Sequence, residues 1–270
     1  MPDLILVLKA ALMGMVEGLT EFLPVSSTGH LILFGHVLRF EGASASVFEI
    51  VIQVGAILSV LWIYRAKFLH VALSLKDEAQ SRKFLSLLLV AFLPAAVLGL
   101  SLHRFIKEHL FNPQVVAISL IVGGVVMLII EKLRLPAKVD DVDRMDWLTA
   151  LKIGFYQCLA MVPGVSRSGA TIIGGMLSGL DRKTAAEFSF FLAVPTLTAA
   201  ALYDLYKNWA SVSANDLWLM AVGFIASFLF GLLAIVGFIR LVVRLGFAPF
   251  AWYRIVLGAV ILAVGMNHGL

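Results

Sequence analysis

Two glutamates, Glu17 and Glu21, stand four residues apart in an otherwise apolar stretch. On a helix this spacing puts both carboxylates on one face, about one turn apart. In a membrane each would cost about 2.5–3.5 kcal/mol, so the pair needs a shared proton, an arginine or a divalent cation. We predict both as catalytic residues and as ligands of a Mg²⁺ or Ca²⁺ ion. The alternative is two acids near a helix end whose side chains reach the membrane surface.

A polar run of five residues, Ser26 to His30, follows shortly after Glu21 and offers three hydroxyls, one imidazole and the backbone N–H groups of an expected helix start. Helix N-termini bind anions because their unpaired N–H groups and the helix dipole converge there. His30 lies three residues after Ser27, so it could take the hydroxyl proton of Ser27 or attack phosphorus itself. Both are predicted to be catalytic, and which one is the nucleophile stays open. The predicted phosphate-binding residues of this run are Ser26, Thr28 and Gly29. The alternative is a hydrogen-bonded helix cap with a packed histidine.

A second polar run, Pro163–Thr171, places Arg167 among small hydroxyl residues at another expected helix start. The guanidinium is a planar fork of donors that matches phosphate oxygens. We predict Arg167 as catalytic, although it could also form a structural ion pair with Glu17 or Glu21, and the two roles do not exclude each other. The predicted phosphate-binding residues of this run are Ser166, Ser168, Gly169 and Thr171.

Composition shows what surrounds these residues. Of the 270 residues, 61% are hydrophobic and 14% are charged, against about 45–50% and 25% in soluble domains. One soluble core could not bury that much apolar surface, so the solvent must be a bilayer. Disordered, collagen-like and disulfide-stapled proteins are excluded, and Cys158 is the single cysteine. In a membrane protein, the net charge of +4 is attributed to Lys and Arg in the loops, which set the orientation in the membrane. No nucleic-acid partner is expected.

The hydropathy pattern predicts an all-α polytopic membrane protein, a single domain over residues 1–270. The expected transmembrane helices are Phe48–Tyr64, Phe84–Leu102, Val115–Ile130, Glu187–Tyr206, Trp218–Ile239 and Phe250–Met266. Leu4–Leu38 and Leu148–Leu180 are apolar but contain the two polar runs. A polar break cannot face lipid, so each stretch is predicted to be a re-entrant helical hairpin. No cleavable signal peptide is expected.

The two halves are copies of one another, with repeat 1 at about 1–135 and repeat 2 at about 145–270. A shift of 140 residues, without a gap, aligns the two polar runs and their flanks for some forty residues. The aligned pairs include Gly14 and Gly154, Glu17 and Gln157, Ser26 and Ser166, Gly29 and Gly169, Gly35 and Gly175, and Phe48 and Phe188. Each half contains three spans, so the pattern predicts an inverted-topology repeat whose hairpins meet near the midplane.

Loop charges predict the orientation. Thirteen basic residues fall in the loops of one side: Arg65, Lys67, Lys76, Arg82, Lys83, Lys132, Arg134, Lys138, Arg144, Arg182, Lys183, Arg240 and Arg244. Four fall on the other: Arg39, Arg104, Lys107 and Lys207. The positive-inside rule then puts both termini outside the cytoplasm, the first hairpin open to the outside and the second to the cytoplasm.

Other polar residues carry less information. Glu49 and Gln53 share one face of the first span and are expected to line the same cavity as the polar runs. Glu187, Asp204 and Arg254 lie near span ends and are expected at the membrane interface.

At these motifs the sequence resembles a known family. Glu17-Gly-Leu-Thr-Glu21-Phe-Leu-Pro-Val-Ser-Ser-Thr-Gly-His30 and Pro163-Gly-Val-Ser-Arg167-Ser-Gly-Ala-Thr171 closely resemble the signature motifs of the bacterial undecaprenyl-diphosphate phosphatases, a family linked to bacitracin resistance. The likeness extends to residues 49–55 and 187–195. It implies hydrolysis of undecaprenyl diphosphate to the monophosphate, which recycles the lipid carrier of peptidoglycan synthesis. It also implies an inner-membrane enzyme with a periplasmic site formed by Glu17, Glu21, Ser27, His30 and Arg167.

Two other functions would use similar residues. Inverted repeats with broken helices are the architecture of secondary transporters, so a transporter or flippase for a polyprenyl phosphate or another anion is the alternative. Another membrane lipid-phosphatase superfamily requires a histidine about six residues after its arginine. The residues after Arg167, Ser168 to Ile173, contain no histidine, so this superfamily is not favoured. The expected partners are a polyprenyl diphosphate and bilayer lipid, with a homodimer left open.

Overall fold

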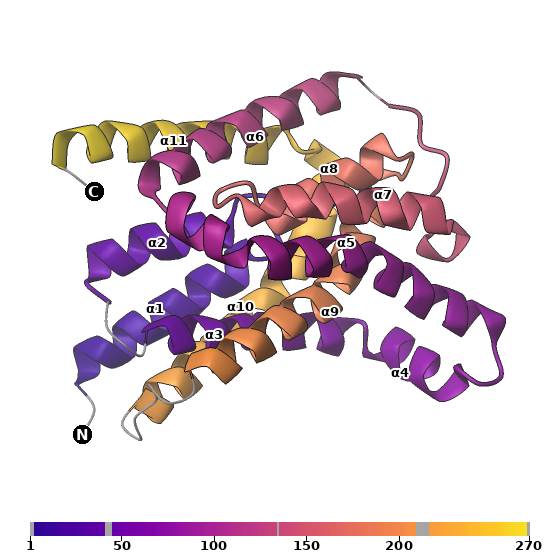
Figure 1. Cartoon of the computed structure of the whole chain (residues 1–270), viewed down its shortest axis with the longest axis horizontal. Helices are drawn as coiled ribbons and strands as arrows, with labels where there is room; N and C mark the ends of the chain where they lie inside the picture. The colour runs from indigo at the N-terminus through magenta and orange to yellow at the C-terminus, as the bar shows by residue number, and fades with distance from the viewer. Residues whose placement is uncertain (1–2, 41–44, 134, 209–215, 269–270) are drawn as a thin grey trace.

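The computed structural model describes residues 3–40, 45–133, 135–208 and 216–268. They form eleven α-helices and two short 3-10 helices, with one isolated β-bridge between Val139 and Leu180 (Figure 1). The predicted all-helical class is confirmed. In chain order the elements are α1 (Leu4–Thr20), α2 (Ser27–Leu38), α3 (Ala45–Ile63), α4 (Arg65–Ser74), α5 (Ala79–His109), α6 (Pro113–Leu133), η1 (Val142–Arg144), α7 (Trp147–Cys158), η2 (Leu159–Met161), α8 (Arg167–Leu177), α9 (Arg182–Asn208), α10 (Asp216–Leu245) and α11 (Ala248–His268).

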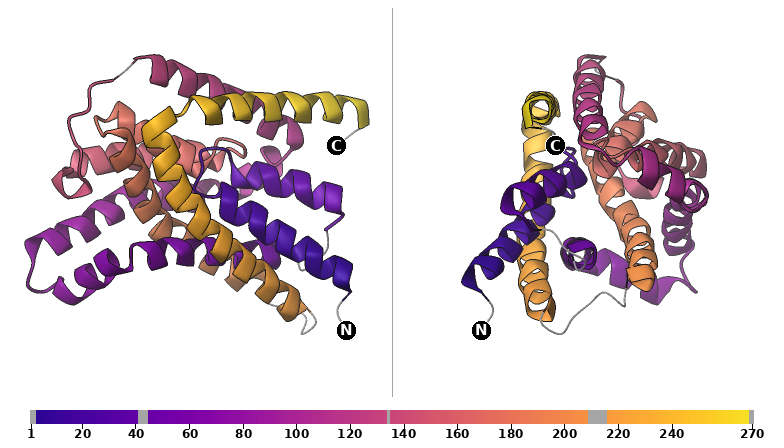
Figure 2. Two further views of the ribbon diagram at one scale, coloured as in Figure 1. Left: turned by 180° about the vertical axis from the view of Figure 1, so that it is seen from behind. Right: turned by 60° about the vertical axis from the view of Figure 1, so that its left-hand side comes forward.

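Five helices in the described part of the chain are long and apolar enough to cross a bilayer. They are α3, α5, α6, α9 and α10, and they coincide with the first five predicted spans. The sixth predicted span coincides with α11, whose described apolar part, Ala248–Ala263, is shorter than the others. Helices α6 and α11 pack side by side (Figure 2).

Two helix pairs, α1–α2 and α7–α8, occupy the stretches that contain the polar runs. α1 packs along α10 and α7 packs along α5. Glycines permit both approaches, because a Cβ at Gly14 would overlap the carbonyl of Gly223 and one at Gly154 would overlap that of Ala91. Gly14 and Gly154 are also paired by the 140-residue shift, so equivalent glycines seat both helix pairs.

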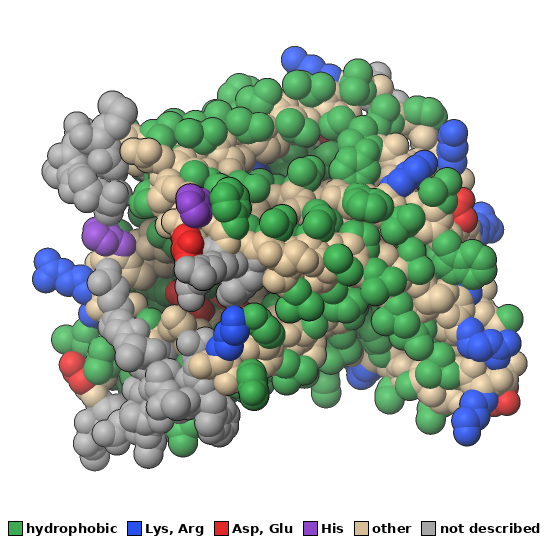
Figure 3. Space-filling view, in the orientation of Figure 1, with side chains coloured by type: hydrophobic (Ala, Val, Ile, Leu, Met, Phe, Trp, Pro, Cys, Tyr) green, Lys and Arg blue, Asp and Glu red, His purple; other side chains and the backbone are tan. Residues whose placement is uncertain are grey.

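Polarity is distributed as expected for a protein in lipid. Large apolar side chains are widely exposed on the outside, Leu73 (82%) and Leu100 (67%) among them. Hydrophobic side chains cover much of the face drawn in Figure 3. The interior holds an apolar core but also Glu17, Glu21 and Arg254, each at most 6% exposed. A buried polar centre inside an apolar exterior fits a membrane protein with a functional interior.

Candidate functional site

Each polar run starts a helix, as predicted. Ser26 caps α2, with its side chain accepting the Gly29 N–H at 3.3 Å. Ser166 caps α8 and accepts the Gly169 N–H at 3.1 Å. Both serines have positive φ angles, 71° and 75°, in a region that residues other than glycine rarely adopt. The two breaks therefore share a capping serine with a positive φ angle, and we call them the first turn (residues 21–26) and the second turn (residues 162–166).

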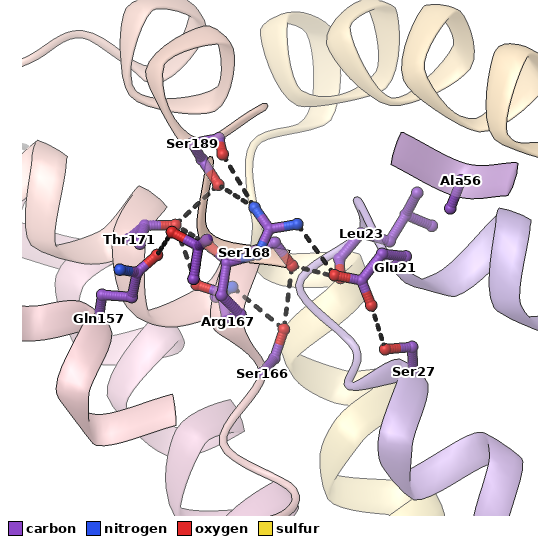
Figure 4. A network of polar contacts seen from close by, with 12 residues as sticks. Glu21, Leu23, Ser27, Ala56, Gln157, Ser166, Arg167, Ser168, Thr171 and Ser189 are labelled. Carbon is purple, nitrogen blue, oxygen red and sulfur yellow. Dashed lines mark hydrogen bonds and ion pairs between the residues drawn. The ribbon is translucent and has the colours of Figure 1, made fainter. Parts of the chain in front are cut away.

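Glu21 joins the two turns. Its Oε2 accepts the Ser27 hydroxyl at 2.5 Å, and its Oε1 accepts an N–H from Arg167 Nη2 at 2.9 Å (Figure 4). The side chains of this ion pair are only 10% and 5% exposed. A hydroxyl of the first run and the arginine of the second therefore contact one carboxylate. The alternative ion pair between Arg167 and Glu21 is also present.

Ser189 of α9 fixes the far side of Arg167. Arg167 Nη1 donates to the Ser189 carbonyl at 2.8 Å and lies 3.3 Å from its hydroxyl, which also contacts Thr171 Oγ1 at 2.7 Å. Arg167 Nε is buried and has no hydrogen-bond partner among the described residues. The sequence reasoning missed Ser189. The 140-residue shift could have found it, because it aligns Ser189 with Glu49, which was expected beside the cavity.

The remaining predicted phosphate-binding hydroxyls of the second run contact protein groups. Ser168 donates to the Leu23 carbonyl of the first turn at 2.8 Å, and its Oγ lies 3.0 Å from that of Ser166. Thr171 donates to the Arg167 carbonyl at 2.9 Å. In the first run, by contrast, Ser27 is half-buried and Thr28 is exposed. The second run is thus a hydrogen-bonded scaffold, whereas the first presents hydroxyls to open space.

His30 is buried and points away from Ser27. Its Nδ1–H donates to the Ser26 carbonyl at 2.7 Å, and its Nε2 lies 2.6 Å from the Tyr253 hydroxyl. The rings of His30 and Tyr253 are stacked, with centroids 5.6 Å apart. Because a carbonyl only accepts, Nδ1 carries a proton. Tyr253 was not predicted, since nothing near it in the sequence marks it.

The prediction that Arg254 lies at the membrane interface is wrong. Its side chain is completely buried and donates to backbone carbonyls of both turns, including Pro24 and Gly164. The helix around it begins at Ala248, so Arg254 lies well inside α11. An arginine within an apolar helix is a functional candidate by default, and this signal was available in the sequence.

A cavity of about 660 Å³ adjoins Ser27. Its polar lining consists of Glu17, Ser27, Thr28, Ser46, Glu49, Gln53 and Asp204. Its apolar lining includes Leu31, Ile32, Ile50, Ile106, Phe111 and Met161. The expected positions of Glu49 and Gln53 on the cavity wall are confirmed. The cavity therefore combines acidic groups, a serine and an apolar wall.

Metal ligands are sparse at this cavity. Within the described part of the chain, no three His, Cys, Asp or Glu side chains gather closely enough to hold a metal ion. Glu17 is 1% exposed, and its Oε2 lacks a hydrogen-bond partner among the same residues. A buried carboxylate oxygen without a partner is costly. The site thus offers an unsatisfied carboxylate beside a cavity, but not a complete protein-made cage.

These features define a multi-pass membrane protein with a buried acid–serine–arginine cluster beside a partly apolar cavity. Residues 10–260 match the family described as bacitracin resistance protein BacA, and the chain belongs to that family. It is 57% identical over 266 residues to undecaprenyl-diphosphatase 2 of Rhodospirillum rubrum, covering 98% of this chain and 97% of the relative. It is 52% identical over 261 residues to the undecaprenyl-diphosphatase of Aromatoleum aromaticum, covering 97% and 95%. The undecaprenyl-diphosphatase of Ectopseudomonas mendocina is 49% identical over 266 residues, covering 98% and 96%.

Proposed function

We propose that this chain hydrolyses undecaprenyl diphosphate to undecaprenyl phosphate and inorganic phosphate, recycling the lipid carrier of cell-wall synthesis. Its full-length relatives are undecaprenyl-diphosphatases. The observation that carries the proposal is Glu21, which binds the Ser27 hydroxyl and Arg167 at once, next to a cavity with an apolar wall. A polyprenyl diphosphate needs an anion site and an apolar path side by side, and this arrangement supplies both.

Ser27 is the nucleophile in this mechanism. Its Oγ attacks the terminal phosphorus while its proton passes to Glu21 Oε2, 2.5 Å away. The bond from that phosphorus to the bridging oxygen breaks, and undecaprenyl phosphate leaves with the bridging oxygen. Water then attacks the phosphorus of the phosphoserine and the Ser27 Oγ–P bond breaks. The proton held by Glu21 returns to Ser27 Oγ, and inorganic phosphate leaves with the oxygen and protons of the water. His30 acts differently, because Ser26 and Tyr253 engage both of its ring nitrogens, so we assign it to positioning of the first turn.

Arg167 stabilises the charge on the transferring phosphoryl group. Glu21 and Ser189 hold its guanidinium in place, and its buried Nε–H is a donor that a phosphate oxygen would satisfy. Donors that are fixed in advance of the reaction stabilise a developing charge without reorganisation. The N–H groups at the start of α2 add the partial positive charge of a helix N-terminus at the same place.

A divalent cation fits Glu17. The unpartnered Oε2 of Glu17 and the nearby Glu49 on the same cavity wall favour a Mg²⁺ or Ca²⁺ ion that takes its remaining ligands from substrate phosphate and water. Such an ion would neutralise negative charge on the diphosphate. Glu21, the second expected ligand, already binds Ser27 and Arg167, so we expect it to contribute less to the metal.

The two helix pairs act as re-entrant hairpins of an inverted repeat. The support is their length: α2 has 12 residues and α8 has 11, or about 18 Å at 1.5 Å per residue, against about 30 Å of hydrocarbon. The matched caps Ser26 and Ser166 support the same repeat. A protease-protection or cysteine-labelling map that found the ends of either pair on opposite sides of the membrane would contradict it.

The site opens to the periplasm, and both termini lie on that side. Both termini are at the left-hand end of Figure 1. The cavity lies toward the same end, because it is lined near the start of α3 and the ends of α5 and α9 by Ser46, Ile106 and Asp204. Most Lys and Arg side chains in Figure 3 lie toward the opposite end, as the positive-inside rule requires of the cytoplasmic side.

Phosphate release from undecaprenyl diphosphate by the purified chain in detergent tests the proposal. Wild type is expected to release phosphate without a gradient or vesicle, and Arg167→Ala to release far less. A chelator is expected to lower the wild-type rate. The transporter or flippase alternative predicts binding without phosphate release, so an inactive but ligand-binding wild type would favour it.

A further inference from the structure

Arg254 is a buried cation whose partners are main-chain carbonyls. Its side chain is 0% exposed and is the bulkiest fully buried one among the described residues. Nε donates to Leu120 O at 3.3 Å, Nη1 to Pro24 O at 3.1 Å and Val165 O at 2.9 Å, and Nη2 to Ser119 O at 3.2 Å and Gly164 O at 2.9 Å. A guanidinium has five N–H donors, and each of them has its own carbonyl here.

These carbonyls belong to three segments that are far apart in the sequence. Pro24 lies in the first turn, three residues before Ser27, and Gly164 lies in the second turn, three residues before Arg167. The second turn also contributes the Val165 carbonyl, and the third segment is the middle of α6, with the carbonyls of Ser119 and Leu120. The turn carbonyls lie outside helices and so lack helical hydrogen bonds. Within a membrane, the protein itself must supply their hydrogen-bond donors. One side chain provides them for both turns.

The surroundings of Arg254 are shaped for a guanidinium. A Cβ at Gly123 of α6 would overlap Nη2, and a Cβ at Gly169 of α8 would lie 3.1 Å from Nη1. Lysine has only three donors on one nitrogen and could not serve five carbonyls in a plane. The packing therefore selects the shape and donor pattern of arginine in addition to its charge.

We propose that Arg254 is the positioning residue that sets Ser27 and Arg167 relative to each other. It acts through the backbone, because three of its five carbonyl partners lie one or two residues before the capping serines Ser26 and Ser166. Ser26 and Ser166 both hold positive φ angles, a conformation that persists only where the surroundings enforce it. Without the common clamp the turns would relax independently, and Ser27 and Arg167 would lose their shared contact with Glu21. This inference rests on the proposed phosphatase function.

The test compares Arg254→Lys and Arg254→Gln with wild type. Each is assayed for phosphate release from undecaprenyl diphosphate and for binding of its methylene-bridged, non-hydrolysable analogue. We expect kcat to fall about 100-fold, the loss that a displacement of about 1 Å can cause. KM and the analogue Kd should stay within about threefold of wild type. A partly unfolded sample would lose binding sites and activity together, so its kcat per binding site would not fall. A wild-type kcat in either folded variant would overturn the proposal.

A double-mutant cycle separates positioning from general stabilisation. In an Arg167→Lys background, Arg254→Lys is expected to lower kcat less than about threefold, because its effect passes through Arg167. The same 100-fold loss in both backgrounds would overturn the proposal. Wild type that binds the analogue but releases no phosphate would instead refute the phosphatase function, so the two failures are distinguishable.

Gly123→Ala keeps the test valid if the Arg254 variants do not fold. Its methyl displaces the guanidinium from α6 and leaves Arg254 in place. The matched control is Gly237→Ala in α10, where no described atom lies within 4 Å of the added Cβ. We expect a lower kcat at unchanged KM for Gly123→Ala and wild-type kinetics for Gly237→Ala. A folded Gly123→Ala with wild-type kcat would overturn the proposal.

Discussion

The first and second turns end in the same kind of capping serine but lead into residues of opposite chemical character. Ser26 and Ser166 cap the following helices in the same way and have φ angles within a few degrees, 71° and 75°. The residue that directly follows the first turn is Ser27, and the residue that directly follows the second turn is Arg167. The two helix starts are alike in their caps, and in the proposed mechanism this single position supplies the nucleophile in the first half and the cation in the second.

The surroundings of the two turns differ as well. Ser27 and Thr28 line the cavity, whereas Ser168 and Thr171 are at most 1% exposed and bind protein groups. The first turn therefore presents groups to substrate, while the second holds Arg167 rigidly and aims it across at Glu21. In the proposed mechanism the first run supplies the reacting group and the second run supplies the charge that stabilises the phosphoryl group.

Ser27→Ala should have the largest effect, because it removes the proposed nucleophile from the first turn. We expect phosphate release to fall at least about 1,000-fold, as for nucleophile deletions in other hydrolases. The matched control is Ser46→Ala, another serine on the cavity wall, which should stay within about threefold of wild type. If both Ser27→Ala and His30→Ala kept near-normal activity, the site assignment would be wrong.

Arg167→Lys tests the cation of the second turn. We expect a loss of about 100-fold to 1,000-fold in kcat, because lysine cannot hold Glu21 and Ser189 simultaneously as the planar fork does. The control is Arg182→Lys, whose partner Glu131 lies 2.6 Å away in a more exposed pair. Kinetics in detergent should show little change in the control, and an equally large loss there would point to a general effect of arginine replacement.

Glu17→Gln makes the first half resemble the second, where the repeat places Gln157. If Glu17 holds the cation, activity should fall about 100-fold and the remaining activity should no longer respond to chelator or to added Mg²⁺. Thermal stability should be kept or raised, since the change removes a buried carboxylate oxygen without a partner. Undiminished Mg²⁺ dependence in this variant would exclude Glu17 as the ligand.

The helices and the motif residues could be predicted because their signals are local. Apolar runs predict α3, α5, α6, α9 and α10, and the polar breaks predict two capped helix starts. The contact between the two runs followed from one further step, the 140-residue shift. Each of these inferences needs only a window of residues or a comparison of two windows.

The supporting residues could not be assigned in this way because their roles depend on distant partners. Arg254 binds the carbonyl of Pro24, 230 residues away, and Tyr253 binds His30, 223 residues away. Backbone carbonyls carry no sequence signal, so an arginine that binds only carbonyls has no complementary residue to identify it. An arginine within an apolar helix could have been considered a functional candidate from the sequence, but its binding partners could be identified only from the fold.

The smallest expected effect is the difference in thermal stability between two variants of the capping serines, Ser26→Gly and Ser166→Gly. Glycine adopts positive φ freely and replaces a serine cap at a cost of only a few tenths of a kcal/mol, so Ser26→Gly should leave stability almost unchanged. Ser166 has a further contact, with Ser168 Oγ at 3.0 Å, so its replacement should cost about 1 kcal/mol more. Thermal unfolding in detergent measures the difference. Equal melting temperatures would mean that the extra hydrogen bonding of the second turn adds no rigidity, and the distinction between a reactive turn and a scaffold turn would then rest on Ser27 and Arg167 alone.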